Sequence, residues 1–298
     1  MILGIRTLFL GLSVAITQAV YPLIPRLYKL FIDAANFEFL SEKLIYRIWN
    51  NLYVLVGVIV LFAIAIKLIS AIVNPDTLAD NKKGAKGAYF RTVIAVILIF
   101  ICPLIFNLAR QVQSDLLADN FLISRVFGYE IKSSSVGQML AWETFSAFCT
   151  PVDEVTRRPL TAEELEMDKT YSEYFSVGVD IDNIEDLDFE LFYSKIAIPA
   201  GDLVNYSGIK YNSLLCPLAG ILVAYELLLL CMDTVFRAAK LAILQLMLPI
   251  VLGAYVFNPD ILKKWAKEYV STFIVVFLKV IAIGFVVIAI TELKGVIF

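Results

Sequence analysis

The sequence predicts an all-α fold, namely a polytopic helical membrane protein with about five transmembrane helices and a small external, mostly helical subdomain. Of its 298 residues, 60% are hydrophobic and only 18% are charged, whereas soluble domains average about 25% charged residues. Several apolar runs reach the roughly 20 residues that a helix needs to cross a bilayer. None of these runs alternates with the period of two that marks a β-barrel strand, so the spans are predicted to be helices.

The first predicted membrane region covers residues 1–128 and begins with an apolar stretch at 1–31. We expect a transmembrane helix at about 7–30, kinked by Pro22 and Pro25 because proline removes a helical hydrogen bond. Two alternatives remain for this stretch. One is a helix that lies in the membrane interface, and the other is a cleaved signal peptide with a weakly basic start.

Two further spans are predicted in this region, at 52–73 and 89–108, after a short amphipathic helix at about 36–50. Asn74-Pro75-Asp76 ends the first of them because proline disfavours a helical conformation of the residue before it. The segment between the spans is basic, and short basic loops remain in the cytoplasm. The cations assigned to this cytoplasmic loop are Lys82, Lys83, Lys86 and Arg91.

Residues 129–213 are predicted to form an extracytoplasmic acidic subdomain. The stretch from Arg110 to Ser213 contains 18 acidic and 8 basic residues, a net charge of −10. Its acidic cluster at 180–190 is interpreted as a solvated face because it lacks the glycine of a calcium-binding loop. Helices are expected at three places in the subdomain: 133–149, about 161–175 and 184–196.

The four cysteines are scattered and the chain has no histidine. Cys149 and Cys216 flank the external region, where they would form a disulfide in an oxidising compartment or remain buried thiols. Cys102 and Cys231 lie within apolar runs and are expected to be packing residues. Without histidine or a C-x-x-C pair, the sequence predicts no metal site and no cofactor.

The second predicted membrane region, 214–298, contains a long helix at about 219–248 and a last span at 269–290. Between them, Asn258-Pro259-Asp260 and a basic segment repeat the pattern that follows the span at 52–73. Both basic loops are therefore placed on the cytoplasmic side of the cell membrane. The cations of this second loop are Lys263, Lys264 and Lys267.

Hydropathy alone would divide residues 214–257 into two spans. However, no glycine or proline lies at the supposed turn between Asp233 and Lys240, so we expect one continuous helix. At 1.5 Å per residue this helix would be about 45 Å long, followed by a re-entrant or surface segment at 249–257. The chain would then cross the membrane five times, with its amino terminus inside, or four times if 1–31 is only interfacial.

A stripe of charges marks the long helix. Glu226, Asp233, Arg237 and Lys240 follow one another at spacings of 7, 4 and 3, which return to nearly the same side of a helix. Lys279 lies near the centre of the last span. Charges at membrane depth are costly and face protein or water. Two interpretations remain open: pairing within the bundle, of Asp233 with Arg237 and Glu226 with Lys279, or the polar lining of a pore or subunit seam.

No motif of enzymatic chemistry is present. The chain lacks G-x-S-x-G, a P-loop, H-E-x-x-H and G-x-G-x-x-G, which mark hydrolases, nucleotide-binding proteins, zinc proteases and dinucleotide-binding folds. We therefore predict that the protein is not an enzyme and has no catalytic residues.

The segment 233–290 reads DTVFRAAKLAILQLMLPIVLGAYVFNPDILKKWAKEYVSTFIVVFLKVIAIGFVVIAI. The earlier half carries AIKLISAIVNPD, a basic glycine-containing loop and RTVIAVILIFICPLIFNLA. These two blocks, roughly 50–110 and 215–290, resemble the TrbL/VirB-type polytopic inner-membrane subunits of bacterial type IV secretion (conjugation) systems. The resemblance consists of hydropathy and a few polar positions, and it does not extend to residues 129–213.

The resemblance implies a scaffold or channel subunit that helps to translocate DNA or protein across the cytoplasmic membrane. Its partners would be the lipid bilayer, other membrane subunits and ATPases of the machine, and further copies of itself, with cargo contacted only indirectly. The alternative is a stand-alone membrane transporter or ion channel, in which Glu226, Asp233 and Lys279 bind a substrate or couple ions. The predicted spans in the first half lack the central break that such a transporter would need, which favours the first interpretation.

Overall fold

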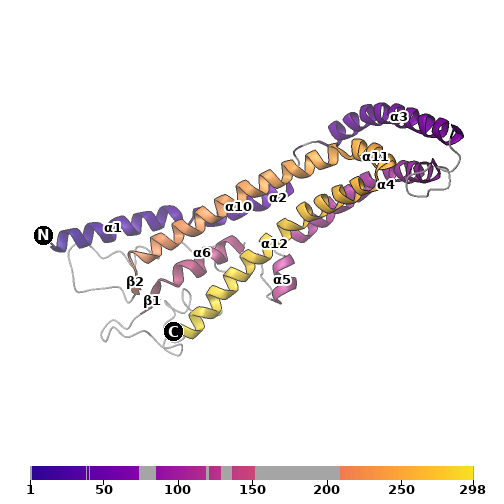
Figure 1. Cartoon of the computed structure of the whole chain (residues 1–298). Helices are drawn as coiled ribbons and strands as arrows, with labels where there is room; N and C mark the ends of the chain where they lie inside the picture. Colours follow the sequence, from indigo (N-terminus) through magenta and orange to yellow (C-terminus); the bar gives the residue numbers. More distant parts are fainter. Residues whose placement is uncertain are drawn as a thin grey trace. The chain divides into compact units, whose positions relative to one another are not determined.

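The computed structural model describes residues 2–37, 39, 41–73, 85–118, 121–128, 136–151 and 209–297. These residues are helical apart from turns and two three-residue strands, so the predicted all-α fold class is confirmed (Figure 1). Four of the described helices are long and apolar enough to cross a membrane. The candidate spans are Lys43–Ile66, Tyr89–Leu117, Leu215–Leu246 and Pro259–Ile290.

The helix predicted at 7–30 is instead two helices, α1 (Ile2–Val20) and α2 (Leu23–Asn36). They are separated at Tyr21 and Pro22, because proline cannot donate a backbone hydrogen bond and its ring clashes with the preceding turn. Neither helix is among the candidate spans. The described residues therefore contain four such helices, the smaller of the two numbers predicted.

The next two helices are longer than predicted. α3 (Glu42–Val73) joins the amphipathic segment at 36–50 to the span at 52–73 without a break. α4 (Ala85–Leu117) extends the span predicted at 89–108 at both ends and continues through Pro103. Sequence patterns place helix boundaries poorly where no capping residue or breaker interrupts the run.

The predicted long helix is confirmed as α10 (Leu215–Leu246), which is continuous through the charged stripe. It is followed by α11 (Leu248–Phe257). The amide of Met247 still donates to Ile243 O at 2.9 Å, and Met247 O accepts from the amide of Val251 at 3.0 Å. Because Pro249 lies in the first turn of α11, where its missing N–H is tolerated, it marks the start of that helix.

The loop predicted after Asn258 is replaced by helix. α12 (Pro259–Ile297) begins directly at the proline, so the span predicted at 269–290 extends at both ends. Proline is well suited to the first position of a helix, where its fixed φ is already helical. The three lysines of the predicted loop lie exposed on the first turns of α12 instead: Lys263, Lys264 and Lys267.

Two short helices, α5 (Phe121–Phe127) and α6 (Val136–Ser146), precede the only strands of the described residues. The helix predicted at 133–149 is thus found as α6. β1 (Cys149–Pro151) pairs antiparallel with β2 (Ile209–Tyr211), with Cys149 opposite Tyr211. This ladder joins the end of α6 to the start of α10 (Figure 1). The other predicted external helices, at 161–175 and 184–196, and the acidic cluster at 180–190 lie outside the described residues.

The chain divides into two compact units. Unit 1 consists of Met1–Asp33, Leu116–Asp233 and Phe277–Phe298, and unit 2 of Ala34–Asp115 and Thr234–Val276. α10 and α12 each contribute one segment to each unit, because the division at Asp233/Thr234 falls inside α10 and the one at Val276/Phe277 inside α12.

Tyr21 is central to the core of unit 1, where it is fully buried. Its ring meets Phe145 of α6 edge-on, with 5.4 Å between centroids, and its hydroxyl donates to Cys216 O at 2.9 Å. The Cys216 thiol in turn donates to that hydroxyl, with 3.6 Å between Sγ and oxygen. Cys216 is thus a buried thiol in the structure, which is the second of the two alternatives given for this residue above. The β1–β2 ladder pairs the residues that flank segment 152–208.

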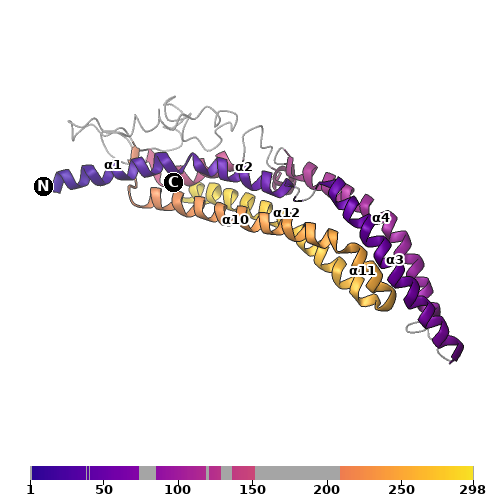
Figure 2. The same cartoon turned by 90° about the horizontal axis from the view of Figure 1, so that it is seen from above.

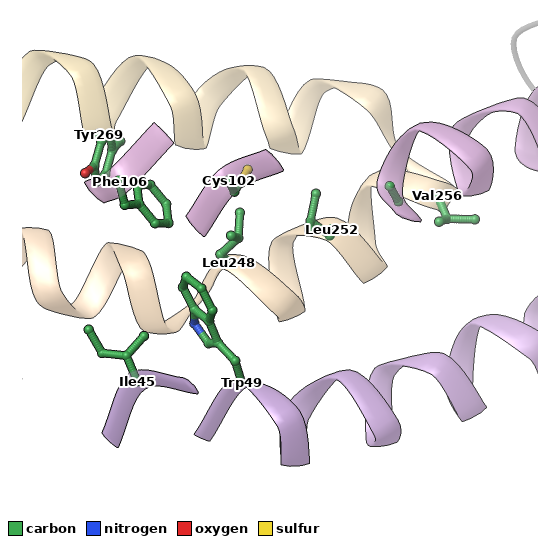
Figure 3. Close-up of a cluster of buried hydrophobic side chains, with 9 residues drawn as sticks. Ile45, Trp49, Cys102, Phe106, Leu248, Leu252, Val256 and Tyr269 are labelled. Carbon is green, nitrogen blue, oxygen red and sulfur yellow. The ribbon is translucent and has the colours of Figure 1, made fainter. Parts of the chain in front are cut away.

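The core of unit 2 forms where α3, α4, α11 and α12 meet (Figure 3). Trp49 of α3 and Phe106 of α4 pack with 5.9 Å between ring centroids. α11 packs closely on α3, since a Cβ added to Gly253 would overlap Val56 Cγ1. Figure 2 shows α11 next to α3 in this unit. The buried residues of this core are Ile45, Trp49, Ala95, Cys102, Phe106, Leu248, Leu252, Val256 and Tyr269.

Candidate functional site

A cleft with several polar side chains in its lining lies within unit 2. Its cavity volume is about 70 Å³. Phe37, Phe39 and Phe273 contribute aromatic walls. The lining includes two guanidinium groups and, among the described residues, no carboxylate. Its polar side chains are Asn36, Arg110, Gln113, Arg237, Gln245 and Tyr269.

Arg237 links the predicted stripe to this cleft. Its Nη2 donates to Ala35 O at 3.2 Å and its Nη1 to Phe273 O at 3.3 Å, and the residue is only 6% exposed. Ala35 lies in the last turn of α2, where carbonyl groups lack helical partners and carry the negative end of the helix dipole. A cation is stabilised at that position, which explains why a buried arginine is tolerated here.

Gln113 donates from Nε2 to the same Ala35 carbonyl at 2.6 Å. One turn earlier, Arg110 Nη2 donates to Asn107 Oδ1 at 2.6 Å. Across the cleft, Gln245 Nε2 donates to the Tyr269 hydroxyl at 3.2 Å. These contacts fix the orientation of the polar lining before any ligand binds.

Sequence reasoning missed Arg110, Gln113, Gln245 and Tyr269. For Arg110 and Gln113, however, the sequence contained a signal. Asn107, Arg110 and Gln113 follow one another at intervals of three in an otherwise apolar helix, which places them on one face. Gln245 and Tyr269 carried no such signal, because each is a single polar side chain among apolar neighbours.

Lys279 pairs with Asp233, so α12 and α10 are joined by an ion pair within unit 1. The Lys279 side chain is 13% exposed and that of Asp233 is 67% exposed. The predicted pairs of Asp233 with Arg237 and of Glu226 with Lys279 are therefore wrong. Arg237 is directed to the α2 terminus instead, and Glu226 is exposed with no ion pair among the described residues.

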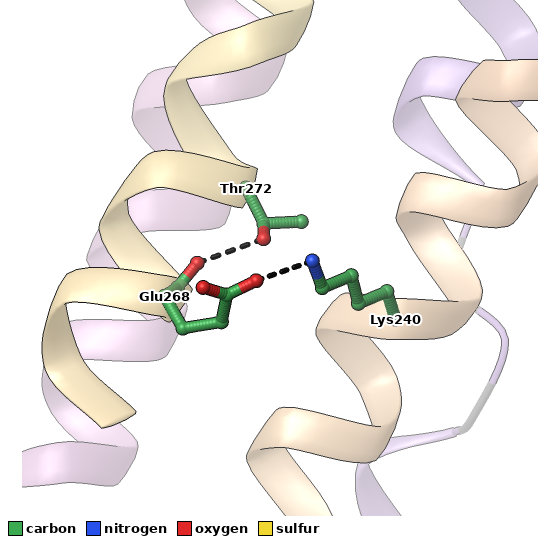
Figure 4. Close-up of polar contacts among 3 residues, drawn as sticks. All are labelled: Lys240, Glu268 and Thr272. Atoms are coloured by element: carbon green, nitrogen blue, oxygen red, sulfur yellow. Dashed lines mark hydrogen bonds and ion pairs between the residues drawn. The ribbon is translucent and has the colours of Figure 1, made fainter. Parts of the chain in front are cut away.

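Lys240 pairs with Glu268 of α12 within unit 2 (Figure 4). Both side chains are about half exposed, at 52% and 53%. Thr272 lies beside this pair, and its hydroxyl donates to Glu268 O at 2.7 Å. The stripe residues thus contact different partners.

Arg91, counted above among the cations of the first basic loop, is buried in α4, and its Nε donates to Val256 O at 3.0 Å. Val256 lies in the last turn of α11, whose carbonyls need partners. Of the other cations of that loop, Lys82, Lys83 and the Lys86 side chain lie outside the described residues.

No group of three or more His, Cys, Asp or Glu side chains that could hold a metal is found among the described residues. The cleft offers N–H and O–H donors and two cations, with no nucleophile beside a general base in its described lining. Comparison of the chain with protein-family models, with curated proteins and with solved structures gives no match.

Proposed function

We propose that the chain is a membrane-embedded scaffold or channel subunit of a type IV secretion or conjugative transfer machine. In this role it would help to translocate DNA or protein across the cytoplasmic membrane without catalysing a reaction. The proposal starts from the resemblance of residues 50–110 and 215–290 to TrbL/VirB-type subunits. We place residues 129–213 outside the cytoplasm, where they would meet outer components of the machine.

One observation favours a subunit of a larger machine over a stand-alone transporter. Three of the four stripe residues and Lys279 contact partners within the protein: Asp233 binds Lys279, Lys240 binds Glu268 and Arg237 binds helix carbonyls. Intramembrane charges that bind a substrate or couple ions must be able to change partners during transport. Charges that are held in contacts between helices are therefore more consistent with a structural seam than with a transport site.

The exposed apolar surface of unit 2 supports assembly in a membrane. Only 6% of the α3 span and 17% of the α4 span are buried within the protein. Large apolar patches mark surfaces that lipid or other subunits cover. Among the exposed side chains of α3 are Val54, Leu55, Ile59, Leu61 and Phe62. We propose that lipid, other membrane subunits and further copies of the chain cover this surface.

Deletion of the gene in its native host, followed by complementation, tests the proposal. We expect deletion to abolish transfer of a conjugative element or secreted substrate, and the wild-type gene to restore it. Asp233→Ala and Lys279→Ala should restore transfer at least about tenfold less well, because the α10–α12 ion pair is lost. Glu226→Ala, which removes an exposed carboxylate of the same helix, is the matched control.

Chemical crosslinking in the same cells, followed by purification and mass spectrometry, identifies the neighbours. Recovery of a secretion ATPase and other machine subunits supports the proposal. If transfer proceeds normally without the gene, while the purified chain alone drives solute flux in proteoliposomes, the protein is a transporter and the proposal fails.

A further inference from the structure

The joint between α10 and α11 contains a backbone acceptor that the helix itself cannot satisfy. Pro249 has no N–H, so the carbonyl of Gln245, four residues earlier, receives no helical hydrogen bond from it. Trp49 of α3 supplies a donor in its place, with 3.0 Å between its indole Nε1 and Gln245 O. Figure 3 shows the Trp49 side chain extending from α3 toward this joint, beside Leu248. The indole thus replaces the hydrogen bond that the proline removes.

A second indole binds the adjacent carbonyl. Trp265 of α12 donates from Nε1 to Leu244 O at 3.0 Å. Leu244 lies in the last turn of α10, where carbonyl groups need partners from outside the helix. A buried indole N–H also needs an acceptor, and Trp49 is only 3% exposed. Two consecutive carbonyls at the joint are therefore bound by side chains from two other helices.

The short helix beyond the joint is attached to its neighbours at separate points. A single residue, Met247, separates α11 from α10, and such terminal positions are where hinges absorb changes in backbone angles. Gly253 of α11 lies against Val56 of α3, and Val256 O accepts a hydrogen bond from Arg91 of α4. All of these residues belong to unit 2. The direction of α11 is therefore set by the surrounding helices as well as by the backbone of α10.

We propose that the α10–α11 joint is a proline hinge, which the indoles of Trp49 and Trp265 hold in the observed state. Both bonds come from side chains of other helices, so a shift of α3 or α12 that withdraws an indole releases α11 without unfolding a helix. The hinge thus links the direction of α11 to the positions of α3 and α12. This inference rests on the fold of unit 2 and does not depend on membership of a secretion machine.

A double-mutant cycle, measured by thermal unfolding of the full chain in detergent, tests the replacement of the proline's bond by an indole. Trp49→Phe keeps an aromatic ring but removes the N–H, and it should lower the Tm by about 2–4 °C, the shift expected for one hydrogen bond. Pro249→Ala restores a backbone N–H for Gln245 O, so Trp49→Phe should cost less in that background. Trp265→Phe, whose acceptor is Leu244 O, should cost the same in both backgrounds.

Electron–electron double resonance between two spin labels measures the motion. The labels are attached at Phe236→Cys of α10 and Ile250→Cys of α11, two exposed positions, in a background without native cysteines. We expect a narrow distance distribution when both indoles are present and a clearly broader one when Trp49→Phe and Trp265→Phe are combined. Adding Pro249→Ala should narrow the distribution again, because a proline is what interrupts the helical ladder.

Trp142→Phe is the matched control, since it removes the third indole of the chain, which lies in α6. It should leave the distance distribution unchanged. A distribution that stays narrow without the indoles of Trp49 and Trp265 would overturn the hinge, and so would an equal cost of Trp49→Phe with and without Pro249→Ala. If Trp49→Phe alone fails to fold, its recovery by Pro249→Ala supports the inference and a lack of recovery contradicts it. None of these measurements involves transfer, so their failure is distinguishable from failure of the proposed function.

Discussion

Lys279 of α12 forms an ion pair with Asp233 of α10, which lies 46 residues earlier in the chain. The lysine side chain is largely buried while the aspartate is more open. Loss of the carboxylate would leave a mostly buried cation without its counter-charge, and such a loss costs more than loss of an exposed surface pair.

Asp233→Ala is therefore expected to lower the free energy of unfolding by about 1–3 kcal/mol, measured by denaturant titration in detergent micelles. Lys279→Ala should cost less than Asp233→Ala, because the remaining carboxylate is exposed. The exchange Asp233→Lys with Lys279→Asp should recover part of the loss. Equal stability of Asp233→Ala and the control Glu226→Ala would show that the pair contributes nothing.

Arg237→Gln is expected to destabilise unit 2 by about 2–3 kcal/mol, because the last turn of α2 loses a cation bound to its carbonyl. Arg237→Lys keeps the charge but cannot reach both Ala35 and Phe273 as a planar fork does, so we expect an intermediate loss. Thermal unfolding followed by circular dichroism measures both variants. Arg47→Gln is the control, and a loss as large in that variant would contradict the specific role of Arg237.

Gly253→Ala is expected to destabilise the packing of α11 on α3 by about 1–3 kcal/mol, since the new Cβ meets the stiff side chain of Val56. The double variant with Val56→Ala should regain most of that loss, which a double-mutant cycle measures as coupling. Gly57→Ala is the matched control, because a Cβ there meets nothing within 4 Å. Additive effects of Gly253→Ala and Val56→Ala would refute the contact.

Cysteines introduced at Asp80 and Lys264, in a background without native cysteines, are expected to react with a membrane-impermeant maleimide only after the cytoplasmic side is opened. Both positions belong to the segments assigned to the cytoplasm by their lysines. The hydrogen bond from Arg91 to Val256 is consistent with this, as it places the start of α4 beside the end of α11. Ser172→Cys should react from outside, and external labelling of position 80 or 264 would overturn the predicted topology.

Local sequence features were sufficient to predict the four long apolar helices. Apolar runs longer than about 20 residues predicted α3, α4, α10 and α12, and the absence of glycine and proline between Asp233 and Lys240 correctly predicted a continuous α10. Proline was harder to interpret. Pro22 separates two helices, whereas Pro103 lies within one and Pro259 starts one, because the effect of proline depends on whether neighbouring groups replace its missing hydrogen bond.

The candidate site could be predicted only in part. The spacing of Asp233, Arg237 and Lys240 identified a charged face on α10, but the predicted partners were wrong. Choosing between an i,i+4 neighbour and a residue on another helix requires knowledge of which helix lies alongside. Arg237 shows this most clearly, since its partner Ala35 is a backbone carbonyl 202 residues away and no side-chain pattern identifies it.

The sequence by itself determined that the chain is helical and apolar enough for a membrane. It also determined which positions along the long helix are charged. These features could be read from the sequence because hydropathy and periodicity are local properties. Only the tertiary structure decided where those charges find partners. It assigned Asp233 to Lys279, Lys240 to Glu268 and Arg237 to the end of α2. It also brought Arg110 and Gln113 of α4 to the cleft that Arg237 lines. Such pairings follow from which helices pack together and in what register, a property of the whole fold.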